Sequence, residues 1–343
     1  LSIVAGENEL AETCARRLME EFPGSPRKPE ALRALAAAAW RVKPPKYRLV
    51  ADLLTRLLKV EKDEVKKERL SAQVADCHFL AGDYESAAAL YLDLRATTKN
   101  SQIADRALSQ AVNASLASGD VEKALRWMNE LLLSGTLGGA RWEAEWNLIA
   151  RLKEMNRVSE ALKRTQTLLT KHESLPADFH VRFMWLDASL SLTMRDSNLT
   201  LAKTNKALDF LVKNENLAEK LRHKLKTQLL LTKGRALLRA GRSDEGLTVF
   251  ADLREGNPDA NASAFSFLVE AYYHAAGNRL DEAQRSLLRL ADGFKGSRYA
   301  PRALYEAALY LERRGQDENL KEGLDLLERL IKEYPSNLLV FYA

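Results

Sequence analysis

A short frame of residues recurs along this chain at intervals that match the length of a helical hairpin. In its clearest copy, Gly82 is followed after five residues by the small Ala87, then by the large Tyr91 and the apolar Leu94. The small residues of nine such copies are Ala11, Ala51, Ala87, Ala124, Ala161, Ala202, Gly246, Ala283 and Gly323. Successive copies lie 36 to 44 residues apart, a period typical of stacked helical repeats.

Each residue type in the frame has a role in a pair of antiparallel helices. A glycine or asparagine takes the left-handed conformation that ends one helix, and the Asp or Ser that follows it caps the next. The small residue lets the two helices approach closely, and the residues four and seven positions later share its face. Aromatic residues make up only 7% of the chain, which favours helix over sheet. The sequence therefore predicts an all-α protein without a sheet.

The run from Gly82 to Ala87 (GDYESA) with Tyr91, and the closing Glu-Tyr-Pro at 333–335, resemble the tetratricopeptide repeat family. A Gly or Ala twelve residues before the small residue is a further family trait, and it occurs at Ala39, Ala75, Gly234 and Ala271. The resemblance covers 1–343 as one continuous array and is weakest over 171–220, where the cap glycine is missing. It implies a right-handed solenoid of about eight antiparallel helical hairpins, with a concave groove lined by the first helix of each hairpin.

Three phrases resemble a bacterial subset of this family that includes outer-membrane assembly lipoproteins and Tol-Pal coordinators. They are EFPGS at 21–25, GFKGS at 293–297 and EYPS at 333–336. The subset implies a location in the bacterial periplasm or cell envelope, with the cytoplasm as the alternative. Because the chain begins inside a repeat, and 338–343 resembles the opening of another helix, we expect a fragment of a longer chain. The longest apolar run, 34–40, is too short to span a bilayer.

Residues with catalytic or metal-binding chemistry are not arranged for either use. None of the five histidines stands in HExxH spacing, and Cys14 and Cys77 are 63 residues apart, so neither belongs to a zinc-binding pair. The glycine cluster from Ser134 to Ala140 lacks the pattern of a phosphate-binding loop and is expected to join two hairpins. The sequence predicts a protein that is not an enzyme, with no catalytic residues, metal or cofactor.

Candidate partner-binding residues follow from the frame and the resemblance together. In the family, groove-facing residues recur four apart on the first helix of each hairpin. Transferred through the frame anchored on Gly246, and through the frame of the next hairpin, they are Leu231, Arg235, Arg239, Leu268, Tyr272 and Ala276. Residues 220–242 contain eight Lys or Arg and no Asp or Glu. We therefore expect an acidic, partly apolar protein segment to bind across the last three hairpins.

Several alternatives stay open at this stage. The basic run is either a solvated face or a contact for an anionic partner, and Phe265, Leu268 and Tyr272 belong either to the core or to the groove. Trp142 and Trp146 either pack between hairpins or anchor a bound peptide. The chain is expected to be a non-catalytic interaction scaffold. The alternatives are the docking region of a larger enzyme or regulator and, more remotely, a nucleic-acid-binding repeat, which would need basic residues in every hairpin.

Overall fold

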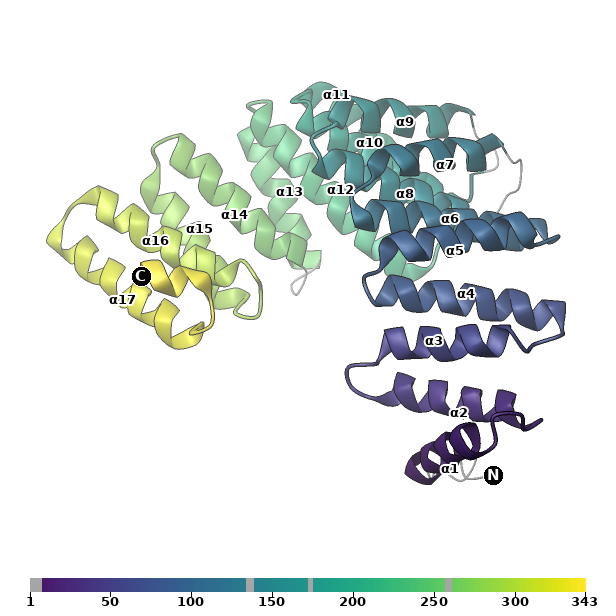
Figure 1. The fold of residues 1–343 in the computed structure, drawn as a ribbon. Helices are drawn as coiled ribbons and strands as arrows, with labels where there is room; N and C mark the ends of the chain where they lie inside the picture. Colours follow the sequence, from purple (N-terminus) through teal and green to yellow (C-terminus); the bar gives the residue numbers. More distant parts are fainter. Residues whose placement is uncertain (1–7, 134–138, 172–174, 257–260) are drawn as a thin grey trace. The chain divides into compact units, whose positions relative to one another are not determined.

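The described part of the chain is built of α-helices that follow one another with short connections (Figure 1). The computed structural model describes residues 8–133, 139–171, 175–256 and 261–343. Within these ranges there are 17 α-helices, one 3-10 helix and no strand. The expectation of an all-α fold is confirmed. The glycine cluster at 134–138 and His172 lie outside the described residues.

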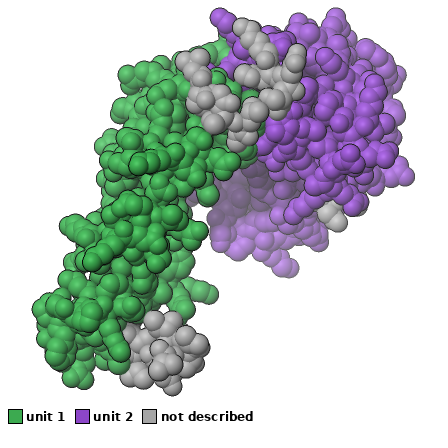
Figure 2. Space-filling model, turned by 90° about the vertical axis from the view of Figure 1, so that its right-hand side faces the viewer, with its two compact units in different colours: residues 1–161 green, residues 162–343 purple. Residues whose placement is uncertain are grey.

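The chain divides into two compact units, 1–161 and 162–343, each described here by itself (Figure 2). Unit 1 contains α1 (Asn8–Glu21), α2 (Lys28–Arg41), α3 (Tyr47–Leu58), α4 (Glu64–Leu80), α5 (Tyr84–Thr97), α6 (Ser101–Ser118), α7 (Val121–Leu133), α8 (Gly139–Glu154) and the start of α9 (Val158–Lys171). Unit 2 contains the rest of α9, α10 (Ala177–Thr193), α11 (Ser197–Lys213), α12 (Glu219–Arg239), α13 (Ser243–Gly256), α14 (Asn261–Ala276), α15 (Leu280–Gly293), α16 (Ala300–Arg314), α17 (Asp317–Glu333) and the 3-10 helix η1 (Leu338–Tyr342).

Helices pair as hairpins in the order that the frame predicts. Within each unit, an even-numbered helix is the first helix of a hairpin and the helix after it is the second, as in α2 with α3 or α16 with α17. The chain enters this pattern at α1, which stands in the place of a second helix, and the boundary between the units falls inside α9. Every small residue of the frame lies on a second helix. In the described residues, seven such hairpins lie within the two units, three in unit 1 and four in unit 2, close to the number expected from the sequence.

The turn inside a hairpin contains a residue in the left-handed conformation. Positive φ angles occur at Gly82, Gly119, Asn156, Arg195, Gly241, Asn278 and Gly315, each directly after a first helix or one residue beyond it. In three of these turns an aspartate follows and caps the second helix: for example, Asp120 Oδ1 accepts from the backbone N–H of Lys123 at 3.0 Å. This geometry is the helix cap that the sequence predicted.

The frame was misplaced in one hairpin, the one formed by α10 and α11. Arg195 has φ +63° there and takes the place of the missing cap glycine. The small position therefore falls five residues later on the fully buried Thr200, whereas Ala202 is exposed. The sequence frame was shifted by two residues because an arginine is not expected in the left-handed conformation.

Small residues permit close helix crossings in both units. Ala87 and Ala124 are fully buried in unit 1. In unit 2, a Cβ atom on Gly246 would lie 2.9 Å from Leu238, and one on Gly234 would lie 2.3 Å from the Phe250 ring. The backbones of α12 and α13 approach this closely because two glycines face each other's helix. In the described residues, no helix is both long and apolar enough to cross a membrane.

Candidate binding groove

Three adjoining cavities form a groove along the first helices of unit 1. Their volumes are about 520, 320 and 770 Å³, and they lie against α2 and α4, against α4 and α6, and along α4, α6 and α8. Asp76 lines all three cavities, and Gln73, Tyr91 and Gln110 each line two. We call this continuous surface the unit 1 groove.

Small side chains on the first helices leave this space open. Ala36 and Ala37 line the first cavity, over Val50 and Leu54 of α3. Ala72 lines the second, over Leu94 of α5. Side chains of the second helices α3 and α5 thus form the apolar floor of the first two cavities.

Part of the groove lining occupies the frame positions that the sequence assigned to a groove, although Ser109 and Trp146 at such positions do not line it. These positions lie fifteen, eleven and seven residues before the small residue. For Ala87 they are Ala72, Asp76 and Leu80. For Ala124 they include Asn113 and Ala117, and for Ala161 they include Ala150 and Glu154. These seven residues all line the groove. The spacing of four residues on first helices thus describes part of this groove. The sequence analysis, however, applied that spacing to other hairpins, those of α12 and α14.

A row of side-chain amides follows the groove from helix to helix. Gln73, Gln110 and Asn147 lie on α4, α6 and α8 at a spacing of 37 residues. Asn147 Nδ2 donates to Asn113 Oδ1 at 3.0 Å, and Asn113 Nδ2 donates to Gln110 Oε1 at 2.9 Å. An amide both donates and accepts, so such a row can pair with the N–H and C=O groups of an extended backbone.

Polar and aromatic groups at the centre of the groove are held in place. Tyr91 Oη donates to Asp76 Oδ1 at 2.5 Å. Burial of the phenol, together with this hydrogen bond, raises the pKa of Tyr91, so the phenol keeps its proton and remains a donor. Trp40 is 46% exposed at the rim and packs edge-on against Tyr47, with ring centroids 5.4 Å apart. The rim therefore offers an accessible aromatic surface to a partner.

The groove does not carry an activated nucleophile at its cysteine. Cys77 is buried beneath the first cavity, and burial raises the pKa of its thiol to about 11. It is therefore a neutral thiol at physiological pH, whereas nucleophilic attack requires a thiolate. In the described residues, no group of three or more His, Cys, Asp or Glu is placed to hold a metal ion.

The residues predicted to bind an acidic segment lie in unit 2 and already contact other groups there. Arg239 Nη1 donates to the backbone oxygen of Leu192 at 2.6 Å. The guanidinium of Arg235 lies 5.7 Å from the centroid of the Phe265 ring, and burial together with Arg239 lowers the pKa of Arg235. Tyr272 Oη donates to Glu306 Oε1 at 2.8 Å.

The apolar members of that prediction lie mostly in the core. Leu231 and Leu268 are 8% and 2% exposed. Trp142 is 1% exposed and lies in the core of unit 1, below the guanidinium of Arg141, as in the packing alternative. Trp146 is half-buried on the same helix. The structure thus brings Arg235, Arg239 and Phe265 together, and it does not place Leu268 or Trp142 at an accessible surface.

Comparison with known proteins gives the fold. The tetratricopeptide repeat family model matches residues 302–337, which cover most of α16 and α17. The apo form of RapI superposes with a TM-score of 0.54 at 11% identity, covering 80% of this chain and 78% of that one. A tetratricopeptide repeat protein from Parabacteroides merdae superposes with a TM-score of 0.50 at 15% identity, covering 76% and 98%. The chain has the tetratricopeptide repeat fold.

A larger protein contains a similar array. It is the signal transduction ATPase with numerous domains from Pyrococcus horikoshii, which has a tetratricopeptide repeat sensor. This structure matches with a TM-score of 0.52 at 15% identity, over 98% of this chain and 53% of that protein. A comparison with curated protein sequences finds no match to this chain. The expected solenoid of tetratricopeptide-like hairpins is confirmed. Solenoids of stacked helical repeats form extended concave surfaces.

Proposed function

We propose that the chain is an interaction scaffold that binds an extended segment of a partner protein in the unit 1 groove. The observation that carries this proposal is the continuous run of three cavities along the first helices α2, α4, α6 and α8. A groove that crosses several helices suits an elongated ligand better than a compact small molecule.

The chemistry of the lining fits a polypeptide. The amides of Gln73, Gln110 and Asn147 supply both donors and acceptors for a peptide backbone, at one-repeat intervals. Trp40 and Leu80, which are 46% and 47% exposed, supply apolar surface for side chains.

Two alternatives differ in how well the groove supports them. Nucleic acid is less well supported, because carboxylates of Glu68, Asp76 and Glu154 stand among the arginines of the lining, whereas a nucleic-acid-binding groove needs basic and aromatic side chains in every hairpin. The docking region of a larger regulator is favoured by the similarity to the Pyrococcus horikoshii protein, in which such an array is part of a longer chain. That role would use the same groove.

Selection from a phage-displayed library of random linear peptides tests the proposal. Peptides that bind the whole chain are synthesised with both ends capped, and their affinities are measured by fluorescence anisotropy. Ala117→Trp places a large side chain in the groove and should weaken binding at least tenfold, because Ala117 is an exposed lining residue. Ala96→Trp is the matched control, since Ala96 is an exposed alanine of α5 outside the cavities. Equal affinities for both variants would contradict the proposal.

A further inference from the structure

Two arginines stand at equivalent positions beside the middle cavity of the unit 1 groove. Arg69 of α4 and Arg106 of α6 each lie eighteen residues before the small residue of their hairpin, and both are exposed. Both line the cavity of about 320 Å³ between α4, α5 and α6. Within the part of the chain that the structure describes, neither guanidinium forms a hydrogen bond or an ion pair.

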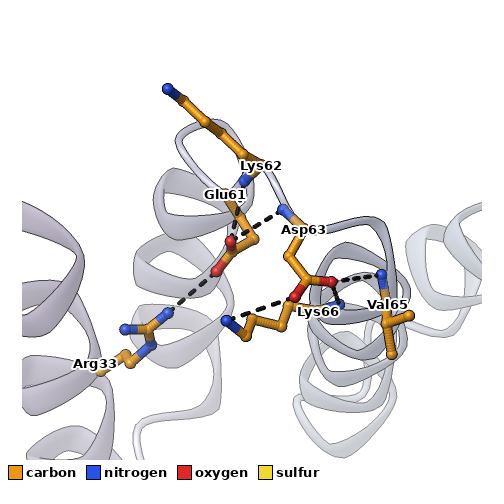
Figure 3. Close-up of polar contacts among 6 residues, drawn as sticks. All are labelled: Arg33, Glu61, Lys62, Asp63, Val65 and Lys66. Atoms are coloured by element: carbon orange, nitrogen blue, oxygen red, sulfur yellow. Dashed lines mark hydrogen bonds and ion pairs between the residues drawn. The ribbon is translucent and has the colours of Figure 1, made fainter.

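The equivalent arginine of the preceding hairpin has its own counter-ion. Arg33 Nη2 of α2 lies 3.2 Å from Glu61 Oε2 (Figure 3). Glu61 Oε1 accepts from the backbone N–H groups of Lys62 and Asp63 at 3.0 and 3.2 Å, and these bonds, that of Asp63 first, lower the pKa of Glu61. Arg33 is thus neutralised by a carboxylate that is fixed in the α3–α4 loop, in contrast to Arg69 and Arg106.

The carboxylates that line the same cavity have hydroxyl partners instead. Glu68 Oε1 accepts from Thr98 Oγ1 at 2.6 Å, and Asp76 Oδ1 accepts from Tyr91 Oη at 2.5 Å. Neither carboxylate lies within ion-pair distance of Arg69 or Arg106 in the described structure. Arg106 acts on the Tyr91 phenol through its charge, and among the described residues neither cation at the rim has an ion-pair partner.

The interior of this cavity is apolar. Its lining includes Ala72 of α4, Leu94 of α5 and Ile103 and Ala107 of α6, and its volume of about 320 Å³ has room for an aliphatic side chain. An exposed arginine–carboxylate pair alone adds little affinity. Next to a filled apolar cavity, from which water is excluded, the same pair contributes more.

We propose that this cavity binds one aliphatic side chain of the partner segment, and that an aspartate or glutamate one or two residues away in that segment pairs with Arg69 and Arg106. The inference rests on the proposed function and adds the sequence preference of the groove. Each guanidinium presents a planar fork of N–H donors that matches the two oxygens of a carboxylate.

The carboxylate belongs to a side chain rather than to a chain terminus. The groove continues past the middle cavity on both sides, since Gln73 is shared with the cavity at α2, and Gln110 is shared with the cavity that reaches α8. A segment that follows the groove therefore passes through the middle cavity without ending there.

The test uses capped peptides selected from the random library with the whole chain. They should share an Asp or Glu within two residues of Leu, Ile or Met. Arg69→Gln with Arg106→Gln should weaken their binding at least tenfold. Changing the Asp or Glu of the peptide to Asn or Gln should weaken its binding to the wild-type chain by the same factor. The amide and acid peptides should then bind the double variant equally. Arg69→Lys with Arg106→Lys should lose part of the affinity, because the charge is kept and the fork is not.

The matched control removes two charges elsewhere in unit 1. Arg48 and Arg126 are exposed on the second helices α3 and α7, and Arg48→Gln with Arg126→Gln should change the affinity less than twofold. Far-UV circular dichroism checks that both double variants are folded.

Other outcomes overturn the inference and separate it from the proposed function. Peptides that bind the Arg69→Gln, Arg106→Gln variant normally but are weakened by Ala117→Trp would place the segment in the groove without the acidic contact. The same conclusion would follow if the selected peptides lacked an acid, or if binding required an uncapped C-terminus. Peptides insensitive to both changes, or a selection that yields no binding peptide, would overturn the proposed function as well.

Discussion

Units 1 and 2 place different residues at the same two positions of the frame. Fifteen and eleven residues before the small residue, α4 of unit 1 has Ala72 and Asp76, whereas α12 of unit 2 has Leu231 and Arg235. In unit 2, α12 packs against both α10 and α14, with Leu231 buried and the guanidinium of Arg235 beside the Phe265 ring of α14. In unit 1 the alanine leaves a cavity that reaches the second helix.

This difference shows that one repeat frame can hold either small side chains beside a cavity or larger side chains packed into the core. The second helices, caps and close crossings are similar in the two units. The size of two side chains on the first helix decides whether apolar surface of the second helix is accessible. A repeat array can therefore restrict its binding site to part of its length without changing its fold.

The close crossing of α12 and α13 in unit 2 is where a substitution should have the largest effect on stability. Because a Cβ at residue 234 would lie 2.3 Å from the Phe250 ring, Gly234→Leu should lower the free energy of unfolding by roughly 3 kcal/mol or more through overpacking. Urea unfolding followed by circular dichroism measures this loss. Gly293→Leu in α15 is the control, since a Cβ there would meet no atom within 4 Å. Similar losses at the two glycines would show that α12 and α13 do not cross so closely.

Two alanines of unit 1 differ in the space around them: one lies at a closed helix crossing and the other lines a cavity. Ala87 is fully buried at a helix crossing, so Ala87→Leu should cost roughly 1–3 kcal/mol of unfolding free energy. Ala37 lines the cavity of about 520 Å³, which has room for the added atoms, so Ala37→Leu should cost less. The measurement is again urea unfolding. If Ala37→Leu were the more damaging change, the cavity at α2 would be narrower than described.

Acid should destabilise unit 2 at a higher pH than unit 1. In unit 2, burial and Lys206 lower the pKa of His180 below its ordinary 6.5, and burial and Arg279 lower that of His274. The unfolded chain therefore binds more protons than the folded one below pH 6.5, and stability is lost as the pH falls through this range. Each histidine should therefore lower the free energy of unfolding as the pH falls from about 7.5 to about 5.5.

In unit 1, the contact between His78 and Asp83 also depends on pH, but the titrating group is a carboxylate rather than a buried histidine. The His78 ring nitrogen, 2.9 Å away, is the main cause that lowers the pKa of Asp83 below its ordinary 3.8. The stability from Asp83 is present at neutral pH and is lost only as the pH falls below about 4. Urea unfolding at several pH values checks both statements. His180→Phe should flatten the pH dependence between 7.5 and 5.5, and an unchanged slope would show that His180 does not contribute.

The sequence was sufficient to predict the helical hairpins, because helix caps and small residues act locally. Gly82, Gly119 and Gly241 have the left-handed conformation expected of them. Arg195 could not be identified as a cap from its residue type, although the Asp196 that follows it repeats the Asp of other copies. That aspartate was the available signal for the correct frame.

The sequence predicted which positions of a first helix face a groove better than it predicted which hairpins contain an open one. The rule for groove-facing residues was applied to the hairpins that contain Arg235 and Tyr272, because charge and aromatic side chains mark binding surfaces. An open cavity depends instead on the packing of neighbouring helices around Ala36, Ala37 and Ala72. Such packing is a property of residues far apart in the chain. The alanines in the run 34–40 were a visible signal that the sequence analysis treated only as an apolar stretch.

The smallest effect is expected from the charges of unit 2 on peptide binding. Arg239 already donates to the Leu192 carbonyl oxygen, and Arg235 stacks near Phe265, so neither guanidinium is as available as Arg69 or Arg106. Arg235→Gln with Arg239→Gln should therefore change the affinity for the selected peptides less than twofold, because free guanidinium forks bind carboxylates more readily than engaged ones. Fluorescence anisotropy at two salt concentrations measures it, and the salt dependence should also be unchanged. If this pair instead weakened binding tenfold while Arg69→Gln with Arg106→Gln did not, the acidic segment would bind across the last three hairpins, and the filled first helices of unit 2 would have to rearrange to admit it.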